Sequence, residues 1–116
     1  MSVVDSAQDQ SRRVAEITLE ECRRHYGGRL VSVALFGSVA RGVATPESDL
    51  DVLVVAEDLV AGRLDRVEEF AAVESRVHER TQGAGRPELS PVIKTPQEVL
   101  LGSPLFWDMT RASLLD

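Results

Sequence analysis

Apolar residues near the start of the chain recur at helical spacing. Residues 6–26 carry them every three or four positions, with Arg and Glu on the other faces, at Ala15, Leu19, Cys22 and Tyr26. This spacing is typical of an amphipathic helix that packs one side against a core. Gly27-Gly28 follow at once, and helices commonly end at such residues. The pattern predicts a helix over residues 6–26.

Two short apolar runs come next, at residues 30–36 (LVSVALF) and 50–56 (LDVLVVA). Short runs rich in valine are typical of strands that are buried on both faces of a sheet. Residues 88–94 resemble a third strand, but Pro91 lacks the N–H that a central strand needs. We therefore expect this third strand to be irregular or to lie at an edge of the sheet.

Residues 60–81 predict a second long helix with two apolar stripes. Val60, Leu64, Val67 and Ala71 form one stripe, and Phe70, Val73 and Val77 form the other, on nearly the opposite side. Two stripes predict either a helix buried on two sides or a helix that keeps one face for a partner.

The last part of the chain predicts short helices. Thr95 precedes Pro96, and Glu98 lies three residues after Thr95, which is the pattern of a capping box with proline at the first helical position. The tail, residues 103–116, is expected to form a last short helix. The order of helix, strand, strand, helix, strand and helix predicts a small α/β sheet with helices packed against it.

Length and composition narrow the class of protein. The 116 residues, 43% hydrophobic and 28% charged, fit one soluble domain over 1–116, with a core at about residues 10–95 and a helical tail over 96–116. The net charge of −6 argues against nucleic acid as the main partner, because phosphate contacts need a basic surface. No apolar run approaches the ~20 residues that cross a bilayer, and the polar start lacks a signal-peptide core. We expect a cytoplasmic protein without a membrane partner.

The lone cysteine and the dispersed basic residues predict no chemistry by themselves. Cys22 has no second cysteine with which to form an intrachain disulfide, and its place on a helix stripe predicts a small buried side chain. His25 and His78 show no metal-ligand spacing and are expected to be structural or on the surface. Lys94 is expected to be a surface lysine.

Asp49 and Asp51 open the second strand and are the first chemical signal. Side chains alternate along a strand, so these two should project on the same side, with Cα atoms about 6.5–7 Å apart. Two neighbouring carboxylates repel unless a cation neutralises them. Mg²⁺ binds one or two carboxylates together with the phosphates of a substrate. The pair therefore predicts a Mg²⁺ site.

Gly37-Ser38 directly follow the first strand and are the second signal. Glycine has no Cβ, so its backbone can approach a ligand closely, and Ser38 offers a hydroxyl and an amide at what looks like a helix start, where phosphate binds well. Alone, Gly-Ser is most often a turn and Asp-x-Asp a solvated strand end. Together, each beside a buried strand, they favour a triphosphate site.

The spacing of the two signals resembles a known family. Gly37-Ser38, ten residues, then Asp49-x-Asp51 is similar to the signature of the DNA polymerase beta-like nucleotidyltransferases. The fuller strings FGSVARG, residues 36–42, and SDLDV, residues 48–52, resemble the minimal nucleotidyltransferases, which are often the antitoxins of pairs with HEPN-domain toxins. The resemblance covers roughly residues 10–95 and is specific between 36 and 55.

The resemblance implies a mixed sheet, a Gly-Ser phosphate loop and two Mg²⁺ ions held by three carboxylates. It assigns two of these to Asp49 and Asp51, and Glu88 is our candidate for the third, although a closer match would have aspartate on a more apolar strand. Ser90 is the alternative occupant of that position, in which case metal binding and catalysis would weaken. Arg41 follows the loop and either contacts a phosphate or braces the loop.

The implied function is Mg²⁺-dependent transfer of a nucleoside monophosphate, with AMP from ATP as the leading case, to an acceptor hydroxyl. The chain is too short to carry a separate acceptor domain, so we expect a partner protein, such as a HEPN toxin, or a second copy to supply the acceptor site. Two alternatives stay open. One is a non-catalytic nucleotide-binding antitoxin, and the other is a small-molecule adenylyltransferase of the antibiotic-modifying type.

Overall fold

The computed structural model describes residues 3–37, 49–81, 88–101 and 113–114, with side chains described from residue 9 to residue 101 within these ranges. The elements, in chain order, are α1 Val3–Tyr26, the 3-10 helix η1 Gly27–Arg29, β1 Leu30–Phe36, β2 Leu50–Ala56, α3 Arg63–Arg80, β3 Leu89–Lys94, α4 Pro96–Leu101 and β4 Ser113–Leu114. Every predicted helix and strand up to residue 101 is present, with ends that differ by a few residues.

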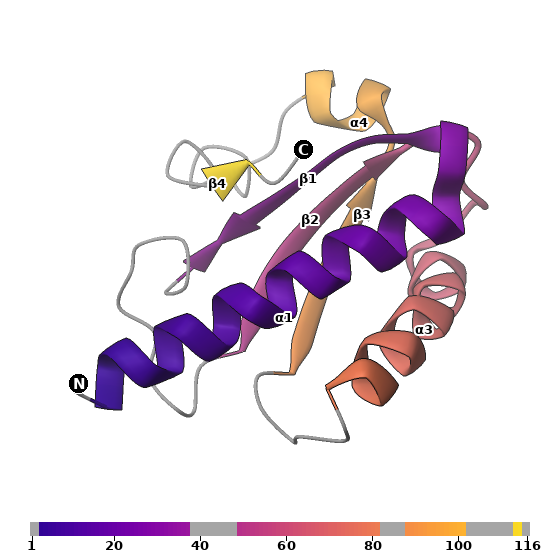
Figure 1. The fold of residues 1–116 in the computed structure, drawn as a ribbon. Coiled ribbons are helices and arrows are strands. Elements are labelled where there is room, and N and C mark those ends of the chain that lie inside the picture. The colour runs from indigo at the N-terminus through magenta and orange to yellow at the C-terminus, as the bar shows by residue number, and fades with distance from the viewer. Residues whose placement is uncertain (1–2, 38–48, 82–87, 102–112, 115–116) are drawn as a thin grey trace.

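The strands form one mixed sheet in the order β3-β2-β1-β4. β1 runs antiparallel to β2 and to β4, whereas β2 runs parallel to β3. β3 lies at one edge of the sheet (Figure 1), as Pro91 predicts. The resemblance implied a mixed sheet, and the topology confirms it.

The prediction for the tail is wrong at Ser113–Leu114. These residues form a strand that pairs with Ala34 and Leu35 of β1, not part of a helix. The open edge of β1 supplies backbone hydrogen-bonding groups that need partners, and a long-range pairing of this kind overrides local preference. Residues 103–112, 115 and 116 lie outside the described residues.

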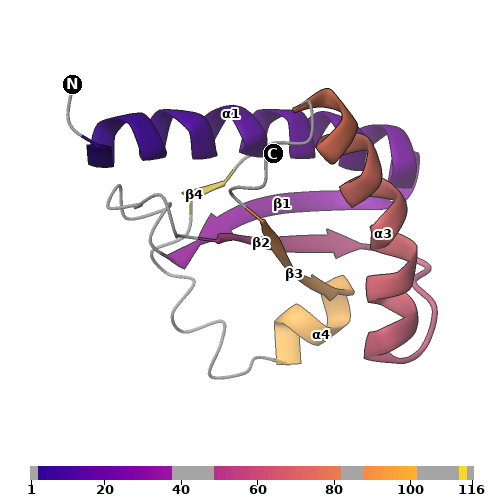
Figure 2. The ribbon, with the colours of Figure 1, turned by 90° about the horizontal axis from the view of Figure 1, so that it is seen from below.

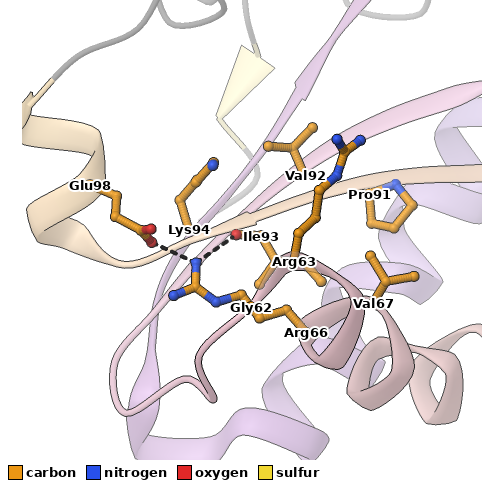
Figure 3. A pocket seen from close by; sticks show the side chains of 9 residues that line it. All are labelled: Gly62, Arg63, Arg66, Val67, Pro91, Val92, Ile93, Lys94 and Glu98. Atoms are coloured by element: carbon orange, nitrogen blue, oxygen red, sulfur yellow. Dashed lines mark hydrogen bonds and ion pairs between the residues drawn. The ribbon is translucent and has the colours of Figure 1, made fainter.

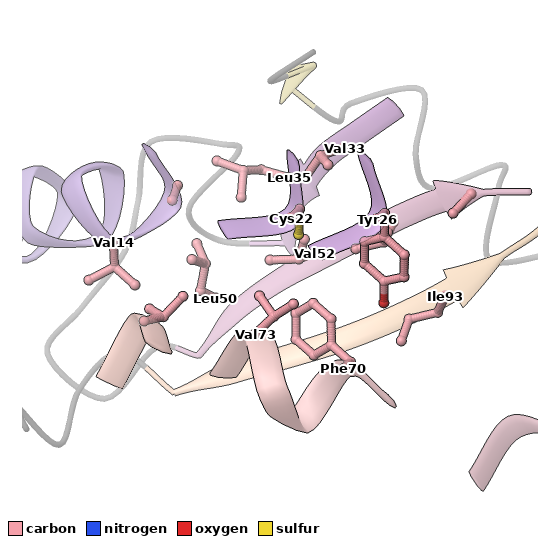
Figure 4. Close-up of a cluster of buried hydrophobic side chains, with 14 residues drawn as sticks. Val14, Cys22, Tyr26, Val33, Leu35, Leu50, Val52, Phe70, Val73 and Ile93 are labelled. Atoms are coloured by element: carbon pink, nitrogen blue, oxygen red, sulfur yellow. The ribbon is translucent and has the colours of Figure 1, made fainter. Parts of the chain in front are cut away.

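Helices cover both faces of the sheet. α1 and α4 lie on opposite sides (Figure 2), and the apolar stripe of α3 packs into the same core cluster as α1. This main core lies between the sheet and the helices α1 and α3 (Figure 4). It includes Val14, Cys22, Tyr26, Val33, Leu35, Leu50, Val52, Phe70, Val73 and Ile93. A smaller cluster of Ala34, Leu53 and Val55 lies on the opposite face, where Val99 of α4 packs against it.

The burial of the central strands follows their place in the sheet. β2 is buried on both faces along nearly its whole length, as its sequence predicts. In β1 only Val33-Ala34-Leu35 are buried, and Val31 is exposed. Full burial of this strand was therefore overestimated, because its pairing with β2 is irregular between Leu30 and Ser32, at Val31.

Two expectations for single residues are confirmed. Cys22 is fully buried, and burial, together with the charge of Glu21, raises the pKa of this thiol to about 12. Thr95 Oγ1 accepts a hydrogen bond from the N–H of Glu98 at 3.2 Å, and Glu98 Oε1 accepts one from the N–H of Thr95 at 2.8 Å. The capping box therefore starts α4 as expected. No helix in the described ranges is long and apolar enough to cross a membrane.

Candidate active site

The predicted site residues lie together at one end of the strands of the sheet. Because β1 and β2 are antiparallel, the end of β1 lies beside the start of β2, where Phe36 pairs with Asp51. Because β2 and β3 are parallel, the start of β3 lies at the same end of the sheet as the start of β2. Gly37 directly follows β1, and Asp49 and Glu88 directly precede β2 and β3, so these three residues lie at this end of the sheet from segments that are distant in sequence.

The pleat of β2 places Asp51 on the face away from α1 and α3. Leu50 and Val52 belong to the main core, whereas Leu53 belongs to the cluster on the opposite face. Asp51 alternates with Leu50 and Val52 and so shares the face of Leu53. Asp51 is half-buried and Asp49 is exposed. Asp49 precedes the first residue of β2, so its projection on the same side as Asp51 stays a prediction.

Gly37 lies directly against Asp51. Its φ of 76° is in the left-handed region that favours glycine. A Cβ built on Gly37 would overlap the Oδ2 atom of Asp51. The backbone conformation therefore favours glycine here, and any larger residue would displace the carboxylate of Asp51. Gly37 and the carboxylate of Asp51 therefore form one compact unit.

Glu88, the candidate third carboxylate, directly precedes β3. The carbonyl oxygen of Glu88 accepts a hydrogen bond from the N–H of Leu50 at 2.7 Å, so its backbone lies at the site edge. Among the described residues, however, no three His, Cys, Asp or Glu side chains gather closely enough to hold a metal ion. Burial, followed by the charge of Glu88, raises the pKa of Glu74 on α3. The Glu88 carboxylate is thus within electrostatic reach of α3.

Ser90 is the residue of β3 that pairs directly with Asp51. In-register neighbours of a sheet share a face, so the exposed Ser90 side chain lies on the face of Asp51. The position beside Asp51 is therefore occupied by a hydroxyl, and the role of Glu88 as third metal ligand stays a prediction. Ser38 and Arg41, the predicted phosphate contacts, lie outside the described residues.

The edge strand β3 borders a feature that sequence reasoning missed. A cavity of about 430 Å³ lies there between the start of α3, β3 and α4 (Figure 3). Lys94 lines it and is half-buried, so the expectation of a surface lysine holds only in part. Arg63 and Arg66 also line it. The apolar stripe of α3 that faces away from the core was the only sequence signal for this region.

Comparison with known sequences finds short matches to proteins named as protein adenylyltransferases. The relatives include Putative protein adenylyltransferase MJ1305 of Methanocaldococcus jannaschii, 48% identical over 48 residues that cover 41% of this chain and 33% of that protein. Putative protein adenylyltransferase MJ0604 of the same organism is 53% identical over 32 residues, covering 28% of this chain and 32% of that protein. The chain thus spans about a third of the length of these relatives.

Solved structures share the fold. A Sulfolobus solfataricus protein described as a putative nucleotidyltransferase superposes with a TM-score of 0.69 at 20% identity, over 98% of this chain and 86% of that chain. A toxin-antitoxin with AMP-PNP superposes with a TM-score of 0.58 at 19% identity, over 87% of this chain and 72% of that chain. At these identities the likeness concerns the fold alone.

The family model described as a nucleotidyltransferase domain matches residues 15–84, more than half of the sequence. The chain therefore belongs to the nucleotidyltransferase domain family.

Proposed function

We propose that this chain transfers a nucleoside monophosphate, AMP from ATP in the leading case, to a hydroxyl group of a partner protein. The observation that carries the proposal is the contact between Gly37 and Asp51. Asp49 and Glu88 lie at the same end of the sheet. In a chain of the nucleotidyltransferase domain family, this arrangement joins a turn that can approach a phosphate with carboxylates that can hold a metal.

The names of related proteins support the choice of substrate and acceptor. Two relatives are named as protein adenylyltransferases, and a protein of the same fold was solved with AMP-PNP, an ATP analogue. Two structures of this fold are toxin-antitoxins. We propose by analogy that the acceptor belongs to a toxin partner, of the HEPN type in the leading case, and that modification neutralises it.

The donor set of the site fits Mg²⁺. Asp49 and Asp51 supply carboxylate oxygens, which this cation prefers, and one or two protein carboxylates suffice where phosphates complete the coordination. When bound, Mg²⁺ would neutralise charge on the triphosphate and on the leaving pyrophosphate. Gly37 would keep the backbone clear for the phosphates, with Ser38 and Arg41 as proposed phosphate contacts.

The reaction is an in-line substitution at phosphorus. The acceptor oxygen attacks the α-phosphorus and forms a new P–O bond, while the bond from that phosphorus to the α,β-bridging oxygen breaks. Pyrophosphate leaves with the electron pair. The proton of the acceptor hydroxyl passes to a carboxylate, Glu88 in this proposal, and help of this kind is worth about 10²–10⁴-fold.

One observation favours a second candidate, a nucleotide-binding antitoxin without transfer activity. Ser90, not an acid, pairs with Asp51 on β3, and no three-acid group is present among the described residues. A site with two carboxylates would still bind metal and triphosphate. It would lack a base for the acceptor.

The test uses α-³²P-labelled ATP, Mg²⁺ and cell lysate, with and without the purified chain. On the transferase reading a labelled protein band appears only with the chain. Asp51→Asn abolishes the band, and Glu88→Gln lowers the rate by at least about 10²-fold with nucleotide affinity little changed. Asp65→Asn is the matched control, because Asp65 is exposed at the start of α3, and it should be fully active.

Three outcomes separate the readings. Nucleotide binding without any labelled product supports the binding module. Transfer that survives Glu88→Gln but not Ser90→Ala assigns the assisting role to Ser90. If chelation of the metal leaves nucleotide affinity unchanged, the two-carboxylate site is wrong.

A further inference from the structure

The cavity runs along β3 from Pro91, the residue directly after Ser90, to Lys94 at the other end of the strand. Lys94 lies four residues beyond Ser90 along β3, about 13 Å in an extended strand. The walls come from the start of α3, from β3 and from α4, namely Gly62, Arg63, Arg66, Val67, Pro91, Val92, Ile93, Lys94 and Glu98 (Figure 3). Its volume of about 430 Å³ is within the usual range of ligand-binding pockets.

Arg66 is a fixed wall of this cavity. Its Nη1 atom donates to Glu98 Oε1 at 2.6 Å and to the carbonyl oxygen of Ile93 at 3.3 Å. Its Nε atom donates to the carbonyl oxygen of Val60 at 2.9 Å, and only 13% of the side chain is exposed. Glu98 therefore compensates the charge of Arg66, and Arg66 joins α3, β3 and α4.

Arg63 and Lys94 leave the cavity with uncompensated positive charge. Neither takes part in an ion pair or a side-chain hydrogen bond within the described ranges. Arg63 is exposed and Lys94 is half-buried. Two such cations at one cavity of a chain with net charge −6 favour an anionic ligand.

The backbone at this cavity is poorly suited to strand addition. β3 is an edge strand, and an exposed edge can pair with an added strand. Here, however, Pro91 has no N–H to donate, and the carbonyl oxygen of Ile93 already accepts from Arg66. These two features disfavour strand addition, so we expect the side chains, not the backbone of β3, to recognise a ligand.

Exposed aliphatic side chains lie on or beside the two helices that border the cavity. Among described residues, the exposed large hydrophobic side chains are Val31, Val60, Leu64, Val67, Leu100 and Leu101. All except Val31 lie at the start of α3, just before it, or on α4, the two helices that border the cavity. Apolar side chains beside a cationic pocket fit a protein surface better than a phosphate backbone.

We propose that this cavity is a docking site for a protein partner through an acidic segment, with a carboxylate between Arg63 and Lys94 and an aliphatic side chain against Val67 and Val92. The carboxylate would bind at the Lys94 end of β3, the end opposite to Ser90. The inference goes beyond nucleotidyl transfer and holds whether or not the chain transfers a nucleotide.

The test is an NMR titration of the full chain with a defined probe. The probe is an acetylated and amidated pentapeptide that carries one glutamate between two leucines, and the control peptide has glutamine in place of glutamate. The glutamate peptide is expected to shift the amide signals of Val67, Val92 and Lys94, and the glutamine peptide to bind about threefold to tenfold more weakly.

Charge-removing variants locate the effect. Arg63→Gln and Lys94→Gln should each weaken binding of the glutamate peptide by about threefold to tenfold. Arg76→Gln, at an exposed arginine farther along α3, should bind as the wild type does, and unchanged melting temperatures should show that all three variants are folded.

Equal binding of both peptides, unchanged binding by the Arg63 and Lys94 variants, or no shifts at the cavity would overturn the proposal. A single-stranded oligonucleotide that shifts the same signals at lower concentration than the peptide would overturn it in favour of nucleic acid.

Discussion

At the scale of single residues, Gly37 has the strictest requirement in the described chain. Its left-handed φ of 76° and the overlap of any Cβ with Asp51 both favour glycine. Gly27 also has a left-handed φ, 56°, but a Cβ there would meet nothing within 4 Å. Substitution of Gly27 therefore introduces backbone strain alone, whereas substitution of Gly37 introduces backbone strain and also displaces Asp51.

We expect Gly37→Ala and Gly27→Ala each to lower the free energy of unfolding by about 1–2 kcal/mol through backbone strain. Only Gly37→Ala should also weaken Mg²⁺-dependent nucleotide binding, by roughly tenfold or more, because the carboxylate of Asp51 must move. Urea unfolding and calorimetry measure the two effects. Nucleotide affinity equal to wild type in Gly37→Ala would show that Asp51 is not part of the nucleotide site.

At the scale of elements, the burial of the α3 side chains bears on the two predictions made from its apolar stripes. Phe70, Val73 and Val77 are buried in the core, whereas Leu64 is 84% exposed. The helix is therefore not buried on two sides within the described structure. Its outward stripe includes Val67 in the cavity wall, and a face kept for a partner stays a prediction.

Phe70→Ala should lower the free energy of unfolding by about 3–5 kcal/mol, because it leaves a cavity in the core. Leu64→Ala, at the other side of the same helix, should change it by no more than about 0.5 kcal/mol. Denaturant unfolding at matched protein concentrations compares them. A loss at Leu64 that grows with protein concentration would instead show that a second copy covers this stripe.

At the scale of the whole molecule, Glu69 connects three elements. Its Oε2 atom accepts from Arg29 of η1 at 2.8 Å and contacts His25 Nε2 of α1 at 2.9 Å. Burial raises the pKa of Glu69, but hydrogen bonds and charge from Arg29 and His25 outweigh burial, so this pKa is lowered below its ordinary value of 4.5. A lowered carboxyl pKa stabilises the fold above the unfolded-state pKa and loses this contribution as the pH falls through the folded-state pKa.

Glu69→Gln should therefore cost about 1–2 kcal/mol at neutral pH and make the loss of stability below about pH 4.5 less steep than in the wild type. Glu68→Gln is the control, since Glu68 is the exposed neighbour on α3, and it should cost less than about 0.5 kcal/mol. Thermal unfolding across acidic pH measures both. Parallel pH profiles for wild type and Glu69→Gln would rule out this linkage.

The sequence by itself determined the features that depend on neighbours along the chain. Helical spacing predicts α1 and α3, valine-rich runs predict β1 and β2, and Thr95 with Glu98 predicts the start of α4, because each pattern acts over a few residues. The Gly-Ser and Asp-x-Asp signals are local in the same way, and the site roles that they indicate stay predictions.

Only the tertiary structure decided the features that depend on segments far apart in sequence. The register of β2 and β3 pairs Ser90 with Asp51, and the open edge of β1 takes residues 113–114 into the sheet. The cavity needs α3, β3 and α4 together. Local periodicity carries no information on strand register or on which distant charges meet, because both depend on how the whole chain packs.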